Sequence, residues 1–295
     1  MKKVAELWQR WVAFCARDED PRPQALLRIL LPWMILMDLG RVAQLGLLKD
    51  YFVPFQEGGI NRVQDSAYIL DSFLPPETAG LVGVAVAAIG LLLASLGVFY
   101  RPALLVGILA YAQVGHLYSP GDRAIDRILR TVLLIWAFSD AHRFWSLNRA
   151  PRMERIAAWP ADLARYLLVI IYLSAGLGKL LAQPAWLAVS GTPVLYRVMT
   201  DPLAAHMDPI AMQSWTWPLR IMGWGTILLE LSVPLVFTRF APYWAIFGVG
   251  MHLGIFYTMD LGMFSWGMLA LYPVVYGPAW LRFRARRSLP TPPGS

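Results

Sequence analysis

The chain has 295 residues, of which 57% are hydrophobic and only 15% are charged. That composition excludes an ordinary soluble domain and, because apolar runs of about 20 residues recur along the chain, predicts an all-α, polytopic helical membrane protein. The formal net charge of +7 comes from basic residues in short connections, so we expect the lipid bilayer, and no nucleic acid, as a partner. The single cysteine, Cys15, excludes an internal disulfide and a cysteine-cluster metal site.

The first residues predict a helix that lies on the membrane surface. Charges continue through Asp18 to Asp20, which argues against a cleavable signal peptide, and Pro21 and Pro23 end the segment. We therefore expect residues 1–22 to form an interfacial helix. Its apolar side chains recur at helical spacing on one face and are Val4, Leu7, Trp8, Trp11, Val12 and Cys15.

Eight apolar segments follow and are predicted to span the membrane, within a range of seven to nine. The basic, proline-rich tail, 282–295, is expected to be a disordered cytoplasmic extension of one domain that covers residues 1–295. Long loops are expected over 48–77 and 182–216. The predicted spans cover about residues 24–47, 79–98, 103–118, 123–138, 165–180, 218–237, 241–259 and 261–281.

The distribution of basic residues predicts the orientation in the membrane. An even number of spans places both termini on one side, and assigning that side to the cytoplasm puts fifteen Lys and Arg residues inside. Only Lys49, Arg62, Arg123 and Arg197 then lie outside. The positive-inside rule therefore predicts a multi-pass protein of the inner (plasma) membrane with both termini in the cytoplasm.

With this topology, ionisable residues from several elements converge on the outer leaflet. Charged groups at such depth are costly and usually functional, so we expect one outer-facing cavity. The converging residues are Lys179 at the end of the fifth span, His116 in the third, Asp126, Arg127 and Arg130 in the fourth, His252 in the seventh and, near mid-membrane, Glu230 in the sixth.

Each of these groups has two interpretations. The face made by Asp126, Arg127 and Arg130 is either an ion-pair network, with Asp126 paired to Arg130, or an anion-binding site. Lys179 is either a neutral amine base in a dry pocket or a lysine that extends its head to the interface. Tyr172 and Gly176 share its helix face, and glycine admits either a neighbouring helix or a flat ligand.

The histidines also have a purely structural interpretation. His116 and His252 are each either hydrogen-bonded core histidines or cavity members. The four histidines of the sequence lie on separate elements without the short spacings of zinc ligands, so no metal is expected.

Four stretches resemble the membrane domain of vitamin K-dependent gamma-glutamyl carboxylase and its bacterial relatives, the horizontally transferred transmembrane (HTTM) proteins. The second is similar to the family pattern Y-F-x-A-G-x-x-K-L followed by a tryptophan, here Trp186. The stretches are DAHRFWSL at 140–147, YLSAGLGKL at 172–180, ELSVP at 230–234, and His252 through GMFSWGML at 262–269.

The resemblance implies a reaction. In the carboxylase, the equivalent of Lys179 is understood as the base that deprotonates vitamin K hydroquinone, so Lys179 and His252 become candidate catalytic residues. The implied cofactor is vitamin K hydroquinone or menaquinol, without a metal. The candidate cofactor-binding residues are Tyr172, Gly176, His116, Asp126, Arg127, Arg130, Trp186 and Glu230.

Two departures from the family limit this transfer. The carboxylase's catalytic histidine falls at about Ile125–Asp126, where the chain has no histidine, and the large lumenal domain is not expected here. We therefore expect quinol oxygenation or epoxidation rather than glutamate carboxylation, with coupling to the modification of a secreted peptide left open. The alternative is a non-catalytic maturation or assembly factor for a secreted peptide or protein. A transporter is less favoured, because the polar residues crowd one leaflet.

Overall fold

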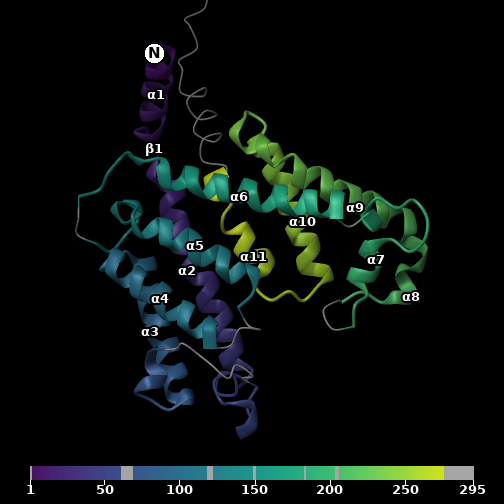
Figure 1. Ribbon diagram of the computed structural model, residues 1–295, viewed down its shortest axis with the longest axis horizontal. Coiled ribbons are helices and arrows are strands. Elements are labelled where there is room, and N and C mark those ends of the chain that lie inside the picture. Colours follow the sequence, from purple (N-terminus) through teal and green to yellow (C-terminus); the bar gives the residue numbers. More distant parts are fainter. Residues whose placement is uncertain are drawn as a thin grey trace, which may run out of the picture. The chain divides into compact units, whose positions relative to one another are not determined.

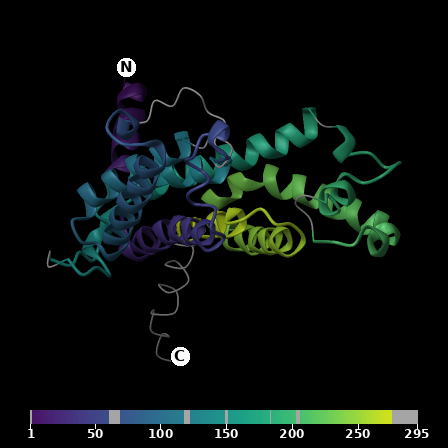
Figure 2. The same cartoon turned by 90° about the horizontal axis from the view of Figure 1, so that it is seen from below.

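The computed structural model describes residues 2–60, 69–117, 122–148, 151–182, 184–202 and 206–275. The chain divides into two compact units, Met1–Ala161 and Asp162–Ser295. Both are built from helices (Figures 1 and 2), which confirms the all-α prediction. The predicted tail, 282–295, and the end of the eighth predicted span lie outside the described residues.

The first unit contains five long helices and one short strand pair in its described part. The strands β1 (Asp18–Glu19) and β2 (Ile156–Ala157) pair antiparallel. Short 3-10 turns occur at Phe55–Glu57, Ile69–Ser72 and Ala141–Arg143. The helices are α1 (Lys2–Cys15), α2 (Pro21–Gln44), α3 (Pro76–Leu96), α4 (Tyr100–Leu117) and α5 (Ala124–Ala137).

Helices α3 and α4 form a closely packed antiparallel pair. Gly97 ends α3 in a left-handed conformation, with φ of 76°, which favours glycine and reverses the chain. A Cβ atom on Gly90 would lie 2.7 Å from the carbonyl oxygen of Ala103 and 2.8 Å from the backbone nitrogen of Gly107. The two backbones therefore touch at these glycines, as expected where small residues line a helix interface in a membrane.

A buried arginine of α2 ties this pair to the connector after α5. The Arg28 side chain is 1% exposed, and its guanidinium donates to the carbonyl oxygens of Ala94 and Ser95 at the end of α3. It also donates to the carbonyls of Phe144 (3.3 Å) and Trp145 (2.5 Å). The stretch 140–147 is thus held by Arg28, which links its carbonyls to those at the C-terminal end of α3.

The second unit is built around α6 (Trp159–Leu177), most of which lies in it, together with α9 (Thr216–Leu231) and α10 (Ala241–Thr258). A π-helical turn, Gly178–Ala182, extends α6, and α11 (Phe264–Leu269) follows α10. Single 3-10 turns cover Pro184–Trp186, Gln213–Trp215 and Val233–Phe237. The predicted loop 182–216 also contains two short helices, α7 (Val194–Met199) and α8 (Pro209–Met212).

Those two short helices form because the loop carries apolar residues that α9 can bury. Met199 and Met212 pack with Leu219 of α9 in a buried cluster. Burial of this kind supplies the stabilisation that such short helices lack by themselves.

Every predicted span coincides with a helix in the described residues, but most of these helices are short or charged. By length and composition, two are long and apolar enough to cross a membrane, Pro76–Leu96 and Trp159–Leu181. By contrast, α2 carries Arg28, Asp38 and Arg41, and α5 has 14 residues. The count of eight spans therefore stays a prediction.

Candidate functional site

Lys179 lies in the π-helical turn that extends α6. The turn covers Gly178–Ala182, directly after the α-helix ends at Leu177. A π-helical turn carries a wider backbone ring than an α-helix, and such turns occur frequently at functional sites. The lysine is therefore placed on an irregular segment at the end of a long apolar helix.

Glu230 of α9 is the partner of Lys179. The Lys179 Nζ atom lies 2.6 Å from Oε1 and 2.8 Å from Oε2 of Glu230. The two side chains are 20% and 7% exposed, so the pair is mostly withdrawn from solvent. Lys179 Nζ also lies 5.4 Å from the ring centroid of Trp186, within cation–π distance.

Gly176 explains why α9 comes close enough to supply Glu230. A Cβ atom at Gly176 would lie 3.1 Å from Cβ of Glu230 and 3.0 Å from Leu231. Of the two interpretations given for this glycine, the structure shows the neighbouring helix. The space beside Gly176 is filled by α9 rather than left open for a flat ligand.

The pairing changes the interpretation of Lys179. The sequence left open a neutral amine in a dry pocket or a lysine that extends its head to the interface, whereas the structure gives the lysine a carboxylate on a neighbouring helix. Opposite charges at this distance compensate each other, which makes both tolerable in an apolar environment. The Lys179 ammonium donates to both carboxylate oxygens of Glu230, at 2.6 Å and 2.8 Å.

A second cluster in the same unit surrounds His252 of α10. The side chain is 1% exposed, and its Nε2 shares a 2.6 Å hydrogen bond with the hydroxyl of Tyr172. The Tyr172 hydroxyl is also 3.0 Å from the hydroxyl of Tyr272. The other ring nitrogen, Nδ1, has no hydrogen-bond partner in the described residues. Three hydroxyl and imidazole groups thus form a continuous buried chain that can move a proton.

Tyr272 was not among the predicted site residues. A Cβ atom on Gly248 of α10 would lie 2.1 Å from its hydroxyl oxygen, so only glycine there leaves room for the tyrosine. Tyr272 follows α11 in an apolar stretch, and its sequence context resembles any core aromatic. The pairing of a tyrosine with a glycine 24 positions earlier has no periodic signal in the sequence.

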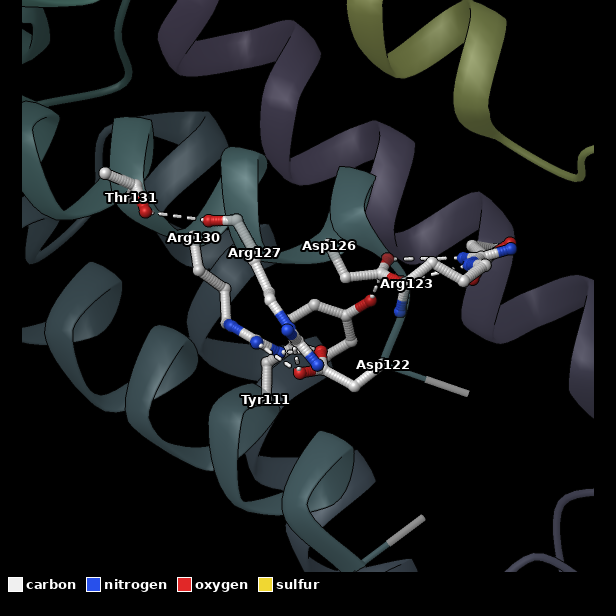
Figure 3. Close-up of polar contacts among 8 residues, drawn as sticks. Tyr111, Asp122, Arg123, Asp126, Arg127, Arg130 and Thr131 are labelled. Carbon is white, nitrogen blue, oxygen red and sulfur yellow. Dashed lines mark hydrogen bonds and ion pairs between the residues drawn. The ribbon is translucent and has the colours of Figure 1, made fainter. Parts of the chain in front are cut away.

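In the first unit, the polar face of α5 is a charge-balanced network (Figure 3). Arg123 contacts Asp126 (Nε to Oδ2, 2.9 Å) and Asp38 (2.5 Å), and the Tyr111 hydroxyl donates to Asp126 at 2.8 Å. Both Asp126 oxygens therefore have donors. Of the two interpretations of this face, the geometry fits the ion-pair network.

The partners within that network differ from the predicted ones. Arg130 was expected to pair with Asp126, but it pairs with Asp122, whose Oδ1 lies 2.6 Å from Nη1. Arg127 contacts the same carboxylate at 3.0 Å. The reason is that the Asp122 carboxylate, just before the helix, reaches both Arg127 and Arg130. The Asp126 carboxylate instead accepts a hydrogen bond from the backbone N–H of Arg123 at 2.9 Å. Three carboxylates face these three guanidiniums, so the contacts within the network balance its charges.

Asp122, which lies before α5, has a lowered pKa. Burial by itself would raise the pKa of this carboxyl, but hydrogen bonds and charge interactions with Arg130 and Arg127 outweigh that effect. The ionised carboxylate is therefore the form that the fold stabilises.

His116 shows no link to this network in the described part of the unit. It lies near the end of α4 and is exposed, so it is not a core histidine. No hydrogen bond or ion pair joins it to Asp126, Arg127 or Arg130 in the described residues. Lys179, Glu230, Trp186, Tyr172 and His252 lie in the second unit, and the charged face of α5 lies in the first.

Comparison with protein families shows to which family the chain belongs. The HTTM domain model matches residues 16–280, which covers nearly the whole sequence and runs through both units. The chain belongs to the HTTM family. No solved structure matches it.

HTTM domains are transmembrane domains associated with vitamin K-dependent carboxylase-like membrane proteins, so the HTTM protein described here is membrane-associated. Three of the four stretches that suggested the family meet in its second unit. The stretch at 172–180 supplies Lys179 and Tyr172, that at 230–234 supplies Glu230, and the last supplies His252. Residues far apart in the sequence thus meet in two clusters of the second unit.

Proposed function

We propose that this HTTM protein is a membrane enzyme that binds a quinol-type lipid, vitamin K hydroquinone or menaquinol. In this proposal the Lys179–Glu230 pair takes a proton from a hydroxyl group of the quinol. The observation that carries the proposal is the pair itself: a cross-helix ion pair, 20% and 7% exposed, beside the indole of Trp186. A charge pair buried in an apolar helix bundle is costly, and such pairs usually serve a function.

The side chains around the pair fit the chemistry of a quinol. A quinol presents hydroxyl groups on a flat aromatic ring, which calls for a hydrogen-bond donor, an acceptor and an apolar face. Lys179 supplies the donor, Glu230 the acceptor, and Trp186 an aromatic surface. When bound, the quinol would supply an electron-rich ring that reacts with oxygen once its hydroxyl has lost a proton.

The pair acts as a base through its shared proton. Transfer of a proton from Nζ to Oε1 over 2.6 Å leaves a neutral amine and a neutral acid, with no change in the total charge. Nζ can then accept one proton from a neighbouring hydroxyl, and the pair gains one positive charge. Glu230 is therefore a catalytic partner of Lys179 in this proposal.

The buried chain of Tyr172, His252 and Tyr272 is the second part of the proposal. A neutral imidazole can accept a proton at Nε2, which already shares a hydrogen bond with Tyr172, and because Nδ1 has no partner in the described residues the chain ends at His252. We assign His252 and Tyr172 to proton movement within the second unit.

Glutamate carboxylation is left out of the proposal. The family's catalytic histidine is replaced at about Ile125–Asp126, and Asp126 is fully engaged by Arg123 and Tyr111. A carboxylate held by these donors is a poor substitute for a titrating imidazole.

The test is an oxygenation assay with purified protein in detergent. Reduced menaquinol or vitamin K hydroquinone is added, and oxygen consumption and the oxidised lipid products are measured. We expect Lys179→Ala to reduce the rate at least about 100-fold, the range typical for loss of a general base. Lys179→Arg keeps the charge but not the amine, and it should be inactive as well.

A matched control separates loss of chemistry from loss of folding. Arg239→Ala changes an exposed cation in the connection before α10 and should leave the rate unchanged. Circular dichroism and size-exclusion profiles of the Lys179 variants should match those of the wild type. Wild-type turnover in a folded Lys179→Ala protein would refute the assignment.

A further inference from the structure

Arg220, near the start of α9, is a buried cation without a carboxylate partner. Its residue exposure is 7%, and no ion pair joins it to any acidic side chain in the described residues. Its Nη2 donates to the carbonyl oxygen of Gly191, and its guanidinium lies 5.3 Å from the ring of Trp217. The Nε atom is buried and has no hydrogen-bond partner in the same part of the chain. An uncompensated buried charge is strongly unfavourable, so an anion is the expected complement.

Arg220 also lines a small cleft. The cleft is shallow, because its empty volume of about 210 Å³ includes open solvent and only about 10 Å³ is free for the centre of a water-sized group; it lies where the segment 185–195 covers the first turns of α9. Apart from Arg220, its lining residues are apolar, with Trp186, Leu195, Leu219 and Gly223 among them. The cleft therefore offers a single positive charge in an apolar setting.

The local fold keeps the guanidinium in this position. Gly191 adopts a left-handed conformation, with φ of 71°, and turns its carbonyl oxygen toward Arg220. The cluster of Met199, Met212 and Leu219 packs the covering segment onto α9. The Gly191 carbonyl takes one of the guanidinium's five N–H donors, and in the described residues the remaining N–H groups have no acceptor.

We propose that this cleft is a binding site for a carboxylate group, held by the guanidinium of Arg220. A carboxylate is planar and carries one charge, which matches one guanidinium, and Arg–carboxylate contacts are among the strongest charge-assisted hydrogen bonds. A phosphate carries more charge than the single cation can balance. The proposal rests on Arg220 and its cleft, and does not depend on the quinol chemistry proposed above.

The cleft adjoins the Lys179–Glu230 pair through one residue. Trp186 lines the cleft, and its ring centroid lies 5.4 Å from Lys179 Nζ. A Cβ atom on Gly223 would lie 3.7 Å from Cε3 of Trp186. A carboxylate bound by Arg220 would therefore lie beside Trp186, which also contacts Lys179 of the candidate active site.

The experiment measures binding to the purified full-length protein in detergent. Thermal unfolding is followed while acetate, propionate, acetylglycine or inorganic phosphate is added, at an ionic strength held constant with sodium chloride. We expect a saturable rise in Tm with the carboxylates and none with chloride. Acetate and propionate represent a free acid, and acetylglycine represents the carboxylate of a peptide end.

Three variants and a control locate the site. Arg220→Met should abolish the saturable shift, and Arg220→Lys should weaken binding at least about tenfold, because the ammonium lacks the two-pronged geometry. Gly223→Ala narrows the cleft without touching Arg220 and should weaken binding several-fold. Arg197→Met removes an exposed arginine of α7 and should bind as the wild type does.

Each outcome either supports or contradicts a carboxylate site at Arg220. If Arg220→Met does not fold, Gly223→Ala and Arg220→Lys still report on the cleft. Unaltered binding in a folded Arg220→Met, or the absence of a saturable shift in the wild type, would overturn the proposal. Preferential binding of phosphate would also overturn it, in favour of a phosphate site such as a lipid headgroup.

Discussion

Lys179 and Glu230 are 51 positions apart, yet their charged atoms are in direct contact. Their stabilisation is mutual, because each removes the cost of burying the other. We therefore predict that Lys179→Met and Glu230→Gln each lower the free energy of unfolding by about 1–3 kcal/mol. The double variant should lose less than the sum of the two, since it leaves no unpaired charge.

A double-mutant cycle measures this coupling. Unfolding of the four proteins is followed in mixed detergent micelles by titration with a denaturing detergent, and the coupling energy should be at least about 0.5 kcal/mol. Additive losses would show that the two side chains do not interact in the micelle-bound protein.

The lowered pKa of Asp122 predicts that the stability of the folded protein depends on pH. Its pKa is lowered in the folded state by Arg130 and Arg127, after a partial offset by burial. Its contribution is therefore fully present above the unfolded-state pKa of about 3.9 and is lost as the pH falls through the lower, folded-state pKa. Asp122→Asn should be less stable than the wild type by about 1–2 kcal/mol at pH 7.

The comparison across pH is the measurement. Tm values of wild type and Asp122→Asn are recorded from pH 7 to pH 3, and the gap should narrow below about pH 4. Asp50→Asn, at an exposed loop position, serves as the control. A gap that stays constant over this range would contradict the role given to the ionised carboxylate.

At the scale of elements, the contact between α3 and α4 depends on glycine. A Cβ atom added at Gly90 would lie 2.7–2.8 Å from backbone atoms of α4. Moving a helix backbone aside to relieve this contact would cost considerable free energy. Gly90→Ala should therefore destabilise the protein by about 1–3 kcal/mol. Gly40→Ala in α2 is the matched control, because no atom lies within 4 Å of its added Cβ. Gly40→Ala should be neutral or more stable by up to about 1 kcal/mol, because alanine has the higher helix propensity. Measuring the Tm of both variants tests the two expectations.

The exposed apolar side chains of the N-terminal helix α1 predict that this helix contacts lipid. Its apolar side chains are exposed, with Val4 71%, Trp8 65% and Trp11 55% accessible. A spin label on Cys15, the only cysteine and an exposed one, should report high oxygen and low nickel-chelate accessibility in vesicles. Trp8→Glu with Trp11→Glu should move the label toward water. A label that is equally aqueous in both proteins would mean that α1 does not lie on the membrane.

The sequence predicted the elements well and the contacts between them poorly. Apolar runs of span length placed α2, α3, α4, α5 and α10 within about three residues and α6 and α9 within about six, because a continuous apolar run is a local signal in the sequence. Partner choice has no such pattern. Lys179 was singled out as a costly charge, but Glu230 was placed near mid-membrane without a partner. Arg220 was passed over because a basic residue near a span end looks like an ordinary interfacial anchor.

Whole-molecule topology follows from charge placement rather than from any contact. If α3 and α9 each cross the membrane, Glu57 and Ile210 lie outside, and Arg239 lies in the cytoplasm. Single cysteines at these exposed positions, in a Cys15→Ser background, can be tested with a membrane-impermeant maleimide on intact spheroplasts. We expect labelling at 57 and 210 without permeabilisation and at 239 only after it. Labelling of 210 and 239 from the same side would mean that α9 does not cross. In that case, the Lys179–Glu230 pair could not lie within a bilayer-spanning bundle, and the cost that makes the pair a functional candidate would disappear.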